Sequence, residues 1–421
     1  MAAVAERHES LVSAFEAFRR EPAFLAAPQS REWAFRRFLD RGFPTTREEE
    51  WKVTSVGPIV ETTWARANAA MLTSSDIAPF RLDGAPAVVI VNGRYAEALS
   101  AQTLPDGVTA AVSHEHQGNT GQTAFADLNG AFYEDVVRLD VAAHAVVETP
   151  IHVLVIAVGG DRPSLIAPRV MIAVGERAQC AVVEEYVGLG GGVTLTTAVT
   201  DVVLGPGAVV EHVKIQREPV TAFHLASQQA ELHRSSTLAS RALTFGGRIA
   251  RNDIGAALRG EGAECTLNGL YVATGQRLVD THTTIDHAMP HCPSHEVYKG
   301  ILAGRARAVF NGKIIVRPQA QKTDAKQTNK ALLLSDDAQI NTKPQLEIFA
   351  DDVKCTHGAA IGQLDEDAFF YLRARGVAEA DARHMLIEAF AGEILDGIRV
   401  AAARERGRAL LESSLAHTLH D

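Results

Sequence analysis

Short β-rich segments follow one another from about residue 85 to residue 360, and this run constrains the fold more than any other feature. Four examples are 86-PAVVIVNG-93, 151-IHVLVIAVGG-160, 193-VTLTTAVTDVVLG-205 and 309-VFNGKIIV-316. Each is bounded by Gly, Pro, Asn or Asp, which is typical of strands between turns. No long helical pattern interrupts the run after about residue 150, so an alternating β-α-β fold is excluded and an all-β domain is predicted.

Two architectures can hold so many strands, namely two sandwiches or one β-solenoid. Internal similarity favours the solenoid, because 175-GERAQCAVVEEYV, 205-GPGAVVEHVKIQ and 260-GEGAECTLNGLY each place a small turn before a strand. Aromatic residues are only 6 % of the chain, and the small aliphatic residues that replace them suit the narrow interior of stacked coils. The strand edges at both ends of such a solenoid must be capped or paired.

Helical patterns flank the strand region. Up to about residue 75, apolar side chains recur at helix-compatible spacings, namely Leu11, Phe15, Phe18, Trp33, Phe35 and Phe38. After the strands, Asp365 is a predicted N-cap and Gly376 a predicted helix end. Two more helices are predicted at about 379–395 and 399–417, the first with an apolar stripe of Met385, Leu386, Ala389, Phe390 and Ile394. The predicted domains are 1–80, 81–362 and 363–421.

Charge and cysteine usage narrow the class of protein. The formal net charge of −10 argues against a protein that wraps nucleic acid. The four cysteines, Cys180, Cys265, Cys292 and Cys355, form no CxxC pair, which suits a reducing cytosol. The N-terminus lacks the apolar core of a signal peptide, and the run 153-VLVIAV-158 is too short to cross a bilayer. We therefore expect a soluble, cytoplasmic protein without a membrane segment.

Several catalytic motifs are absent from the sequence. It contains no GxxxxGK[ST], GxSxG or HExxH pattern, and 188-GLGGG-192 misses the GxGxxG register. The chain is therefore not expected to hydrolyse ATP by itself. No pair of acidic residues stands out for glycoside hydrolysis, although a β-helix carbohydrate-active enzyme remains an alternative that requires a groove lined with carboxylates.

Histidines are densest in 280-DTHTTIDHAMPHCPSHEVYKG-300. The spacing of these residues matches no standard zinc pattern, and Pro290 and Pro293 indicate an irregular backbone. A structural hydrogen-bonding network is the favoured interpretation. A self-contained metalloenzyme built on His282, His287 and His291 is the alternative, and the segment also contains Cys292 and His295.

A second candidate site lies in 351-DDVKCTHGAAIG-362. If this segment is a strand, Cys355 and His357 face the same side and lie roughly 7 Å apart. Thiolate and imidazole are ligands that suit iron–sulfur clusters, zinc and copper. Two ligands do not close a tetrahedral site, however, and a buried Cys that acts as a small hydrophobic residue is the other interpretation.

Three segments resemble the SufB/SufD family of iron–sulfur cluster assembly scaffolds. They are 309–376, 281-THTTIDHAMPHCPSHEVYKGIL-302 and, more weakly, 47-REEEWKVT-54, in which Val53 stands where Tyr is usual. The order Lys354–Cys355–Thr356–His357–Gly358 and the short chain are more similar to SufD-like members than to SufB-like members. A SufB-like paralogue is the alternative within the family.

The resemblance implies a right-handed parallel β-helix between helical domains and a non-catalytic scaffold function. It implies a SufB-like partner subunit and a SufC-like ATPase that docks on the C-terminal helical domain. It also implies a transient iron–sulfur cluster at the interface between the two scaffold subunits, with His357 as a ligand or iron-entry residue and Cys355 beside it. No cofactor is expected on the isolated chain, for which a homodimer is one possible state.

Overall fold

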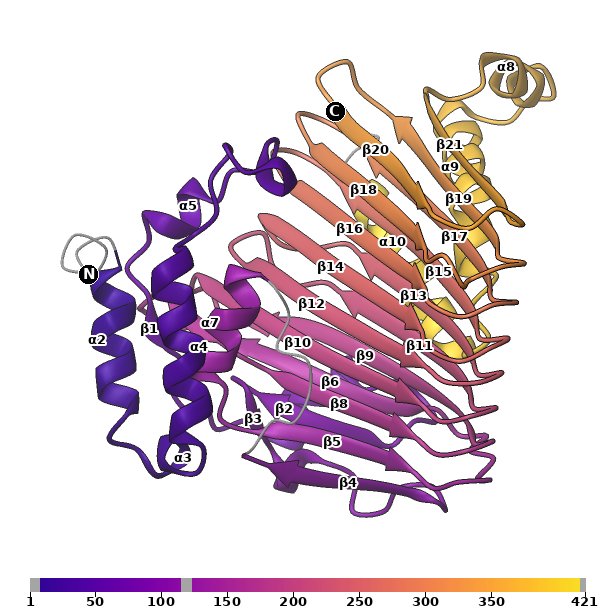
Figure 1. Cartoon of the computed structure of the whole chain (residues 1–421). Helices are drawn as coiled ribbons and strands as arrows, with labels where there is room; N and C mark the ends of the chain where they lie inside the picture. Colours follow the sequence, from indigo (N-terminus) through magenta and orange to yellow (C-terminus); the bar gives the residue numbers. More distant parts are fainter. Residues whose placement is uncertain (1–7, 115–122, 417–421) are drawn as a thin grey trace.

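The computed structural model describes residues 8–114 and 123–416, which form a mainly β protein. Its strands wind into a β-solenoid of about eight turns with two long faces (Figure 1). The solenoid predicted from the β-rich run is therefore confirmed. In spatial order, the first sheet contains β20 (Gln339–Ile348), β18 (Arg307–Val316), β16 (Leu278–His287), β14 (Ile249–Leu258), β12 (Phe223–Leu232), β10 (Thr194–Leu204), β8 (Arg169–Val174), β5 (Val136–Val141) and β4 (Val108–Ser113), with β7 (Ser164–Ile166) and β1 (Ala65–Arg66) beside β10.

Successive turns of the chain add strands alternately to this sheet and to a second one. In spatial order, the second sheet contains β21 (Lys354–Gly362), β19 (Asp324–Leu333), β17 (Pro293–Leu302), β15 (Glu264–Ala273), β13 (Thr237–Thr244), β11 (Val209–Gln216), β9 (Gln179–Leu189), β6 (Ile151–Val158), β2 (Ala87–Val91) and β3 (Arg94–Tyr95). Neighbouring strands from β6 to β21 are parallel and in register, and side-chain hydrogen bonds between adjacent turns join residues that are, for example, 28, 30 and 31 positions apart. Equivalent side chains therefore stack in columns along the solenoid axis.

The interior of the solenoid contains buried ionisable side chains as well as apolar ones. Tyr186, Val202 and Leu238 belong to the largest apolar cluster. Between them, the buried Glu184 carboxylate lies 3.1 Å from His212 Nε2 and accepts a hydrogen bond from Thr200. Burial alone would raise the pKa of Glu184, but its hydrogen bond with His212 and the neighbouring positive charges lower this pKa to about 2.

The two ends of the solenoid differ. At one end, β3 and β4 run antiparallel to β2 and β5 and complete the two sheets. At the other end, β20 and β21 each pair with a strand on one side only in the described structure. One end therefore closes with antiparallel strands, and the other ends in two parallel strands that each leave one edge unpaired in the described structure.

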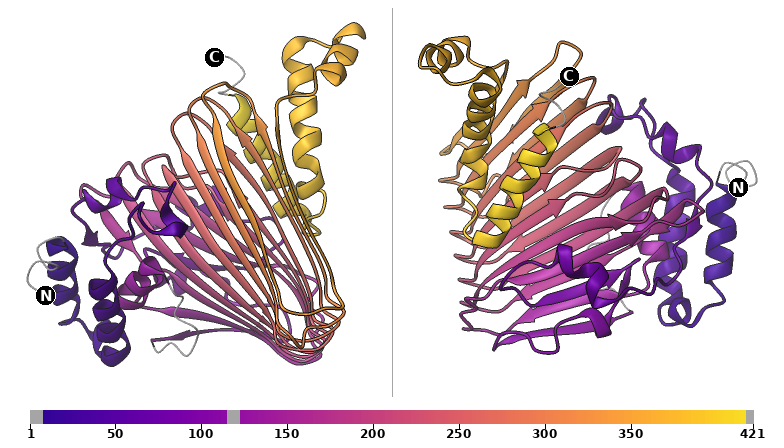
Figure 2. Two further views of the ribbon diagram at one scale, coloured as in Figure 1. Left: turned by 45° about the horizontal axis from the view of Figure 1, so that its top comes forward. Right: turned by 180° about the vertical axis from the view of Figure 1, so that it is seen from behind.

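The N-terminal helices pack against the first sheet and against α7 (Ala124–Phe132), as Figures 1 and 2 show. Their aromatic cluster includes Phe15 and Phe35, whose ring centroids lie 3.9 Å apart. Trp33 is 51 % exposed, because it lies on the solvent side of α4 (Pro28–Arg41), where its ring stacks with Arg37. α7 is a helix that the strand pattern did not predict. The elements are α2 (Glu9–Phe18), α3 (Pro22–Leu25), α4 (Pro28–Arg41), η1 (Glu49–Trp51), α5 (Gly57–Val60), α6 (Ser74–Ile77), η2 (Ala78–Phe80), η3 (Glu97–Leu99) and α7 (Ala124–Phe132).

The C-terminal helices are α8 (Glu366–Ala374), α9 (Glu379–Leu395) and α10 (Ala401–Ala416), and α9 and α10 pack on the outside of the second sheet (Figure 2). The predicted cap is confirmed, since Asp365 Oδ1 accepts a hydrogen bond from the Ala368 backbone N–H at 3.0 Å. The predicted stripe on α9 is partly wrong. Met385 and Ala389 are exposed, because contact with the sheet turns a neighbouring face inward, which is formed by Ala382, Ile387, Ala391, Ile394 and Leu395. Of the helices in the described residues, none is long and apolar enough to cross a membrane.

Candidate functional site

Cys355 and His357 lie on β21, the terminal strand of the second sheet. In the pairing of β21 with β19, Ala325 and Gln327 are the Cα partners of Cys355 and His357. Both partners are buried inside the solenoid, so Cys355 and His357 lie on the lumen side of the last turn. Cys355 is half-buried and His357 is exposed, because no further turn of the described chain covers this face. The two side chains therefore share an open face.

Apolar side chains surround this open end. Ile348, Phe349 and Ile361 are 40 %, 59 % and 49 % exposed, and they lie on β20, just after it and on β21. Exposed apolar residues beside unpaired strand edges are typical of a surface that pairs with another chain. The last turn thus combines potential metal donors with the features of a protein interface.

Two buried polar side chains lie one and two turns beneath His357. Gln327 on β19 and Glu296 on β17 occupy the same column, and Gln327 Nε2 donates a hydrogen bond to Glu296 Oε2 at 2.7 Å. Burial raises the pKa of Glu296 to about 7, against the effect of hydrogen bonds from Thr283 and Gln327. Burial also raises the pKa of the Cys355 thiol, so this thiol needs a metal or a nearby positive charge to become a thiolate ligand.

The histidines of the segment 280–300 do not converge. His287 is buried in the lumen with its Nε2 atom 2.9 Å from Ser294 Oγ, and burial lowers its pKa to about 4. His291 is exposed in a turn, and Cys292 is buried with its Sγ donating to the Gly260 carbonyl at 3.4 Å. Throughout residues 8–114 and 123–416, no group of three or more His, Cys, Asp or Glu side chains is arranged to hold a metal ion. His295 is half-buried on β17. The placements of these histidines give no support to the metalloenzyme alternative and agree with structural roles for the buried ones.

His282 instead fastens the N-terminal segment to the outside of the first sheet. Its ring nitrogens lie 3.0 Å from Asp280 Oδ1 and 3.0 Å from Glu50 Oε2. The Trp51 ring stacks under the Arg251 guanidinium at 3.8 Å, and Thr54 Oγ1 donates to Asp280 Oδ2 at 2.7 Å. The weakly matching motif 47-REEEWKVT-54 is therefore a docking segment, which we call the strap (residues 48–54).

A groove of about 760 Å³ lies between the strap and the first sheet. It is lined by carboxylates, as a carbohydrate-active enzyme would require, but the two on the sheet, Asp253 and Asp286, are paired with cations. Asp253 lies 2.7 Å from Arg251, and Asp286 lies 2.9 Å from Arg317. Paired carboxylates of this kind are poor general acids, so the groove does not favour glycoside hydrolysis.

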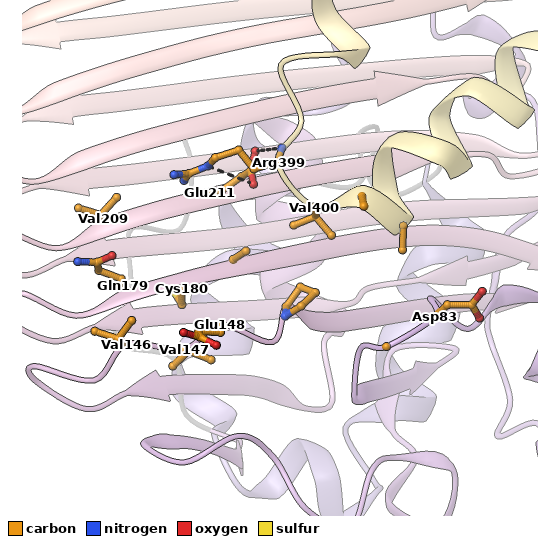
Figure 3. A pocket seen from close by; sticks show the side chains of 15 residues that line it. Asp83, Val146, Val147, Glu148, Gln179, Cys180, Val209, Glu211, Arg399 and Val400 are labelled. Atoms are coloured by element: carbon orange, nitrogen blue, oxygen red, sulfur yellow. Dashed lines mark hydrogen bonds and ion pairs between the residues drawn. The ribbon is translucent and has the colours of Figure 1, made fainter.

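A pocket of about 480 Å³ lies on the outside of the second sheet, where the segment before α10 crosses β9 and β11 (Figure 3). The backbone N–H of Arg399 donates to Glu211 Oε1 at 2.9 Å, and the Arg241 guanidinium lies 2.8 Å from the same oxygen. Neither Cys355 nor His357 lines this pocket, so it is separate from the candidate site.

Comparisons with known protein families agree with the resemblance of the sequence. The family model described as "SUF system FeS cluster assembly, SufBD core domain" matches residues 156–390. The model described as "SufBD protein N-terminal region" matches residues 8–153. Together these two matches cover the N-terminal helices, the solenoid and the start of the C-terminal helices.

Curated relatives match along most of the chain. An iron–sulfur cluster assembly SufBD family protein of Synechocystis sp. is 33 % identical over 389 residues, which cover 87 % of this chain and 86 % of the relative. The iron–sulfur cluster assembly protein SufD of Escherichia coli is 31 % identical over 379 residues, 89 % of each chain. Protein ABCI7, chloroplastic, of Arabidopsis thaliana is 32 % identical over 313 residues, 72 % of this chain and 66 % of the relative. The chain therefore belongs to the SufBD family of iron–sulfur cluster assembly proteins.

Proposed function

We propose that the chain is a SufD-like, non-catalytic scaffold subunit whose open solenoid end pairs with a SufB-like subunit. His357 and Cys355 then supply imidazole and thiolate donors to a nascent iron–sulfur cluster at the interface, and the partner supplies the remaining ligands. The cluster is cargo that is built and passed on. The cytoplasmic location and the division into domains 1–80, 81–362 and 363–421 remain predictions.

One observation carries this proposal: the only two potential soft ligands on β21 lie on its uncovered lumen face. Cys355 and His357 are two residues apart on a strand whose other edge is unpaired in the described chain. A tetrahedral site needs more donors than this face offers. A second subunit that covers the apolar rim, which consists of Ile348, Phe349 and Ile361, can supply the missing donors. Its binding also removes water from the site.

The test is to co-express the full chain with its scaffold partner and the ATPase and to measure iron and acid-labile sulfide in the purified complex. His357→Ala should lower both contents while the complex still assembles, because the variant removes a donor without touching the apolar rim. His291→Ala, which alters an exposed turn histidine on another part of the solenoid, is the matched control. Unchanged iron and sulfide in the His357→Ala complex would refute the assignment.

The second part of the proposal is that α8 docks a SufC-like ATPase. Phe370 and Tyr371 on α8 are 73 % and 56 % exposed, and α8 projects away from the solenoid (Figure 2). Exposed aromatic residues on a projecting element are typical anchors of a protein interface. We take α8 rather than the whole C-terminal region as the dock, because α9 and α10 cover apolar residues of the second sheet such as Leu243 and Leu270.

Surface variants are therefore a sharper test than deletion of the C-terminal helices. Phe370→Asp combined with Tyr371→Asp should abolish co-purification of the ATPase and leave the pairing of the two scaffold subunits intact. Met71→Asp, at an exposed apolar residue on the N-terminal side, is the control. If the double variant retains the ATPase, the dock lies elsewhere.

A further inference from the structure

Gln327 carries a buried polar atom that nothing in the solenoid satisfies. It is 1 % exposed and is the Cα partner of His357 on the adjacent strand. Its Nε2 atom donates to Glu296, whereas its Oε1 atom has no hydrogen-bond partner among the described residues. Buried acceptors are normally paired, so an unpaired one directly below the candidate site requires an explanation.

The orientation of this amide is determined by its surroundings. Nε2 of the amide faces the Glu296 carboxylate one turn below, so Oε1 is the atom that points away from Glu296. The facing strand also confines the amide. A Cβ atom at Gly312 would come within 2.3 Å of Gln327 Nε2, so only glycine there leaves room for this side chain. The amide is thus held with its carbonyl oxygen unused.

The His357 ring needs an acceptor for its N–H group, just as the Gln327 oxygen needs a donor. It lies on the lumen face of the next turn, and it has no hydrogen-bond partner within the described residues. A neutral imidazole binds a metal through one bare nitrogen and carries its proton on the other, which needs an acceptor. Histidines that ligate metals usually donate this N–H to a carboxylate or a carbonyl oxygen. The unpaired amide oxygen of Gln327, the Cα partner of His357, can provide such an acceptor.

We propose that Gln327 is a positioning residue that accepts a hydrogen bond from the inward ring nitrogen of His357, with Glu296 holding the amide in place. The bond selects one tautomer and leaves the other nitrogen bare toward the open end. The purpose of this bond rests on the function proposed above for His357. The bond is specific to this column, because the next buried amide on β19, Asn329, has Ala359 as its Cα partner and can position no ligand.

The test uses the full chain labelled with nitrogen-15 in its histidines, free of iron. Long-range proton–nitrogen spectra distinguish the two imidazole tautomers, and the loss of one set of signals in His357→Ala identifies residue 357. We expect a single dominant tautomer for His357 in the wild-type chain and a mixture like that of the exposed His291 in Gln327→Met, which keeps the side-chain length. Asn329→Leu, which removes the neighbouring buried amide, should leave the tautomer of His357 unchanged.

Two results would overturn the proposal. One is a His357 tautomer ratio that is equal to that of His291 in the wild-type chain, a comparison that needs no variant to fold. The other is the same dominant tautomer in the wild-type chain and in Gln327→Met. In the co-expressed complex, Gln327→Met should weaken iron retention about tenfold or more, the usual effect of removing the partner of a ligating histidine.

The outcomes also separate this inference from the proposed function. If His357→Ala leaves iron and sulfide unchanged, the cluster role fails and the positioning role of Gln327 fails with it, whatever the tautomer. If His357→Ala lowers them but the tautomer does not depend on Gln327, the cluster role stands and only the positioning role is refuted.

Discussion

The attachment of the strap to the solenoid should depend on pH through His282. Burial tends to lower the pKa of this histidine, but the charge and hydrogen bond of Asp280 and the hydrogen bond of Glu50 raise it from 6.5 to about 9. Because the pKa in the folded state lies above the unfolded value, the stabilisation is complete below pH 6.5 and is lost as the pH rises toward 9.

The size of the effect follows from the shift and from the exposure of the partners. A rise from 6.5 to about 9 corresponds to at most about 3 kcal/mol. Asp280 lies on β16 beside His282 and keeps its interaction when the strap opens, so only the share of Glu50 holds the strap. Glu50 is half exposed, and solvent screening weakens this share. We therefore expect at most about 1 kcal/mol of protection for the strap at low pH.

Hydrogen exchange of the peptide that contains residues 48–54 measures this local opening. The wild-type chain and His282→Gln should differ by at most about 1 kcal/mol in opening free energy below pH 6.5 and should converge above pH 9. His291→Gln controls for the loss of an exposed histidine. If the wild-type chain and His282→Gln differ equally at both pH values, the charge of His282 is not what holds the strap.

Three further predictions concern the lumen and the open end. The pKa of Glu296 is raised from 4.5 to about 7, so the folded chain binds more protons over this range and loses stability as the pH rises through it. Glu296→Gln should therefore unfold at a higher temperature than wild type above pH 7 but not below pH 4.5, and an equal shift at both would contradict this reasoning. Gly312→Ala should cost about 1–3 kcal/mol in urea unfolding, because the new methyl group collides with Gln327; wild-type stability would show that the lumen adapts. Ile361→Lys should keep the circular dichroism of the wild-type chain but prevent co-purification with the scaffold partner, and retained pairing would move the interface away from β21.

Local features of the sequence were sufficient for several elements. The bounds of α9 follow from helical periodicity, and the cap at Asp365 follows from the preference of aspartate for the first turn. Such signals involve residues within a few positions of one another. Contacts with distant segments decided the rest. Met385 was expected on the buried stripe, but packing against the second sheet selects the face that includes Ile387.

Gln327 and Glu296 were missed as parts of the candidate site, although one signal was available. Aligning 294-SHEVYKG, 325-AKQTNKA and 355-CTHGAAI by their strand positions places Glu296, Gln327 and His357 in one column. Without the register, a Gln and a Glu in a strand carry no sign of burial. The interpretation of the histidine-rich segment as a structural network agrees with the structure, but its strap partner, Glu50, lies 232 residues away from His282 and could not be predicted.

The sequence by itself determined that the chain forms strands between helical ends, and that Cys355 and His357 share one face of a strand, because both follow from the alternation of side chains over a few residues. Only the tertiary structure decided which end of the solenoid stays open, which buried amide lies beneath His357 and which acidic segment meets His282. These choices depend on parallel pairing between strands that are distant in the sequence. The register of this pairing is set by the packing of the whole solenoid rather than by any local preference.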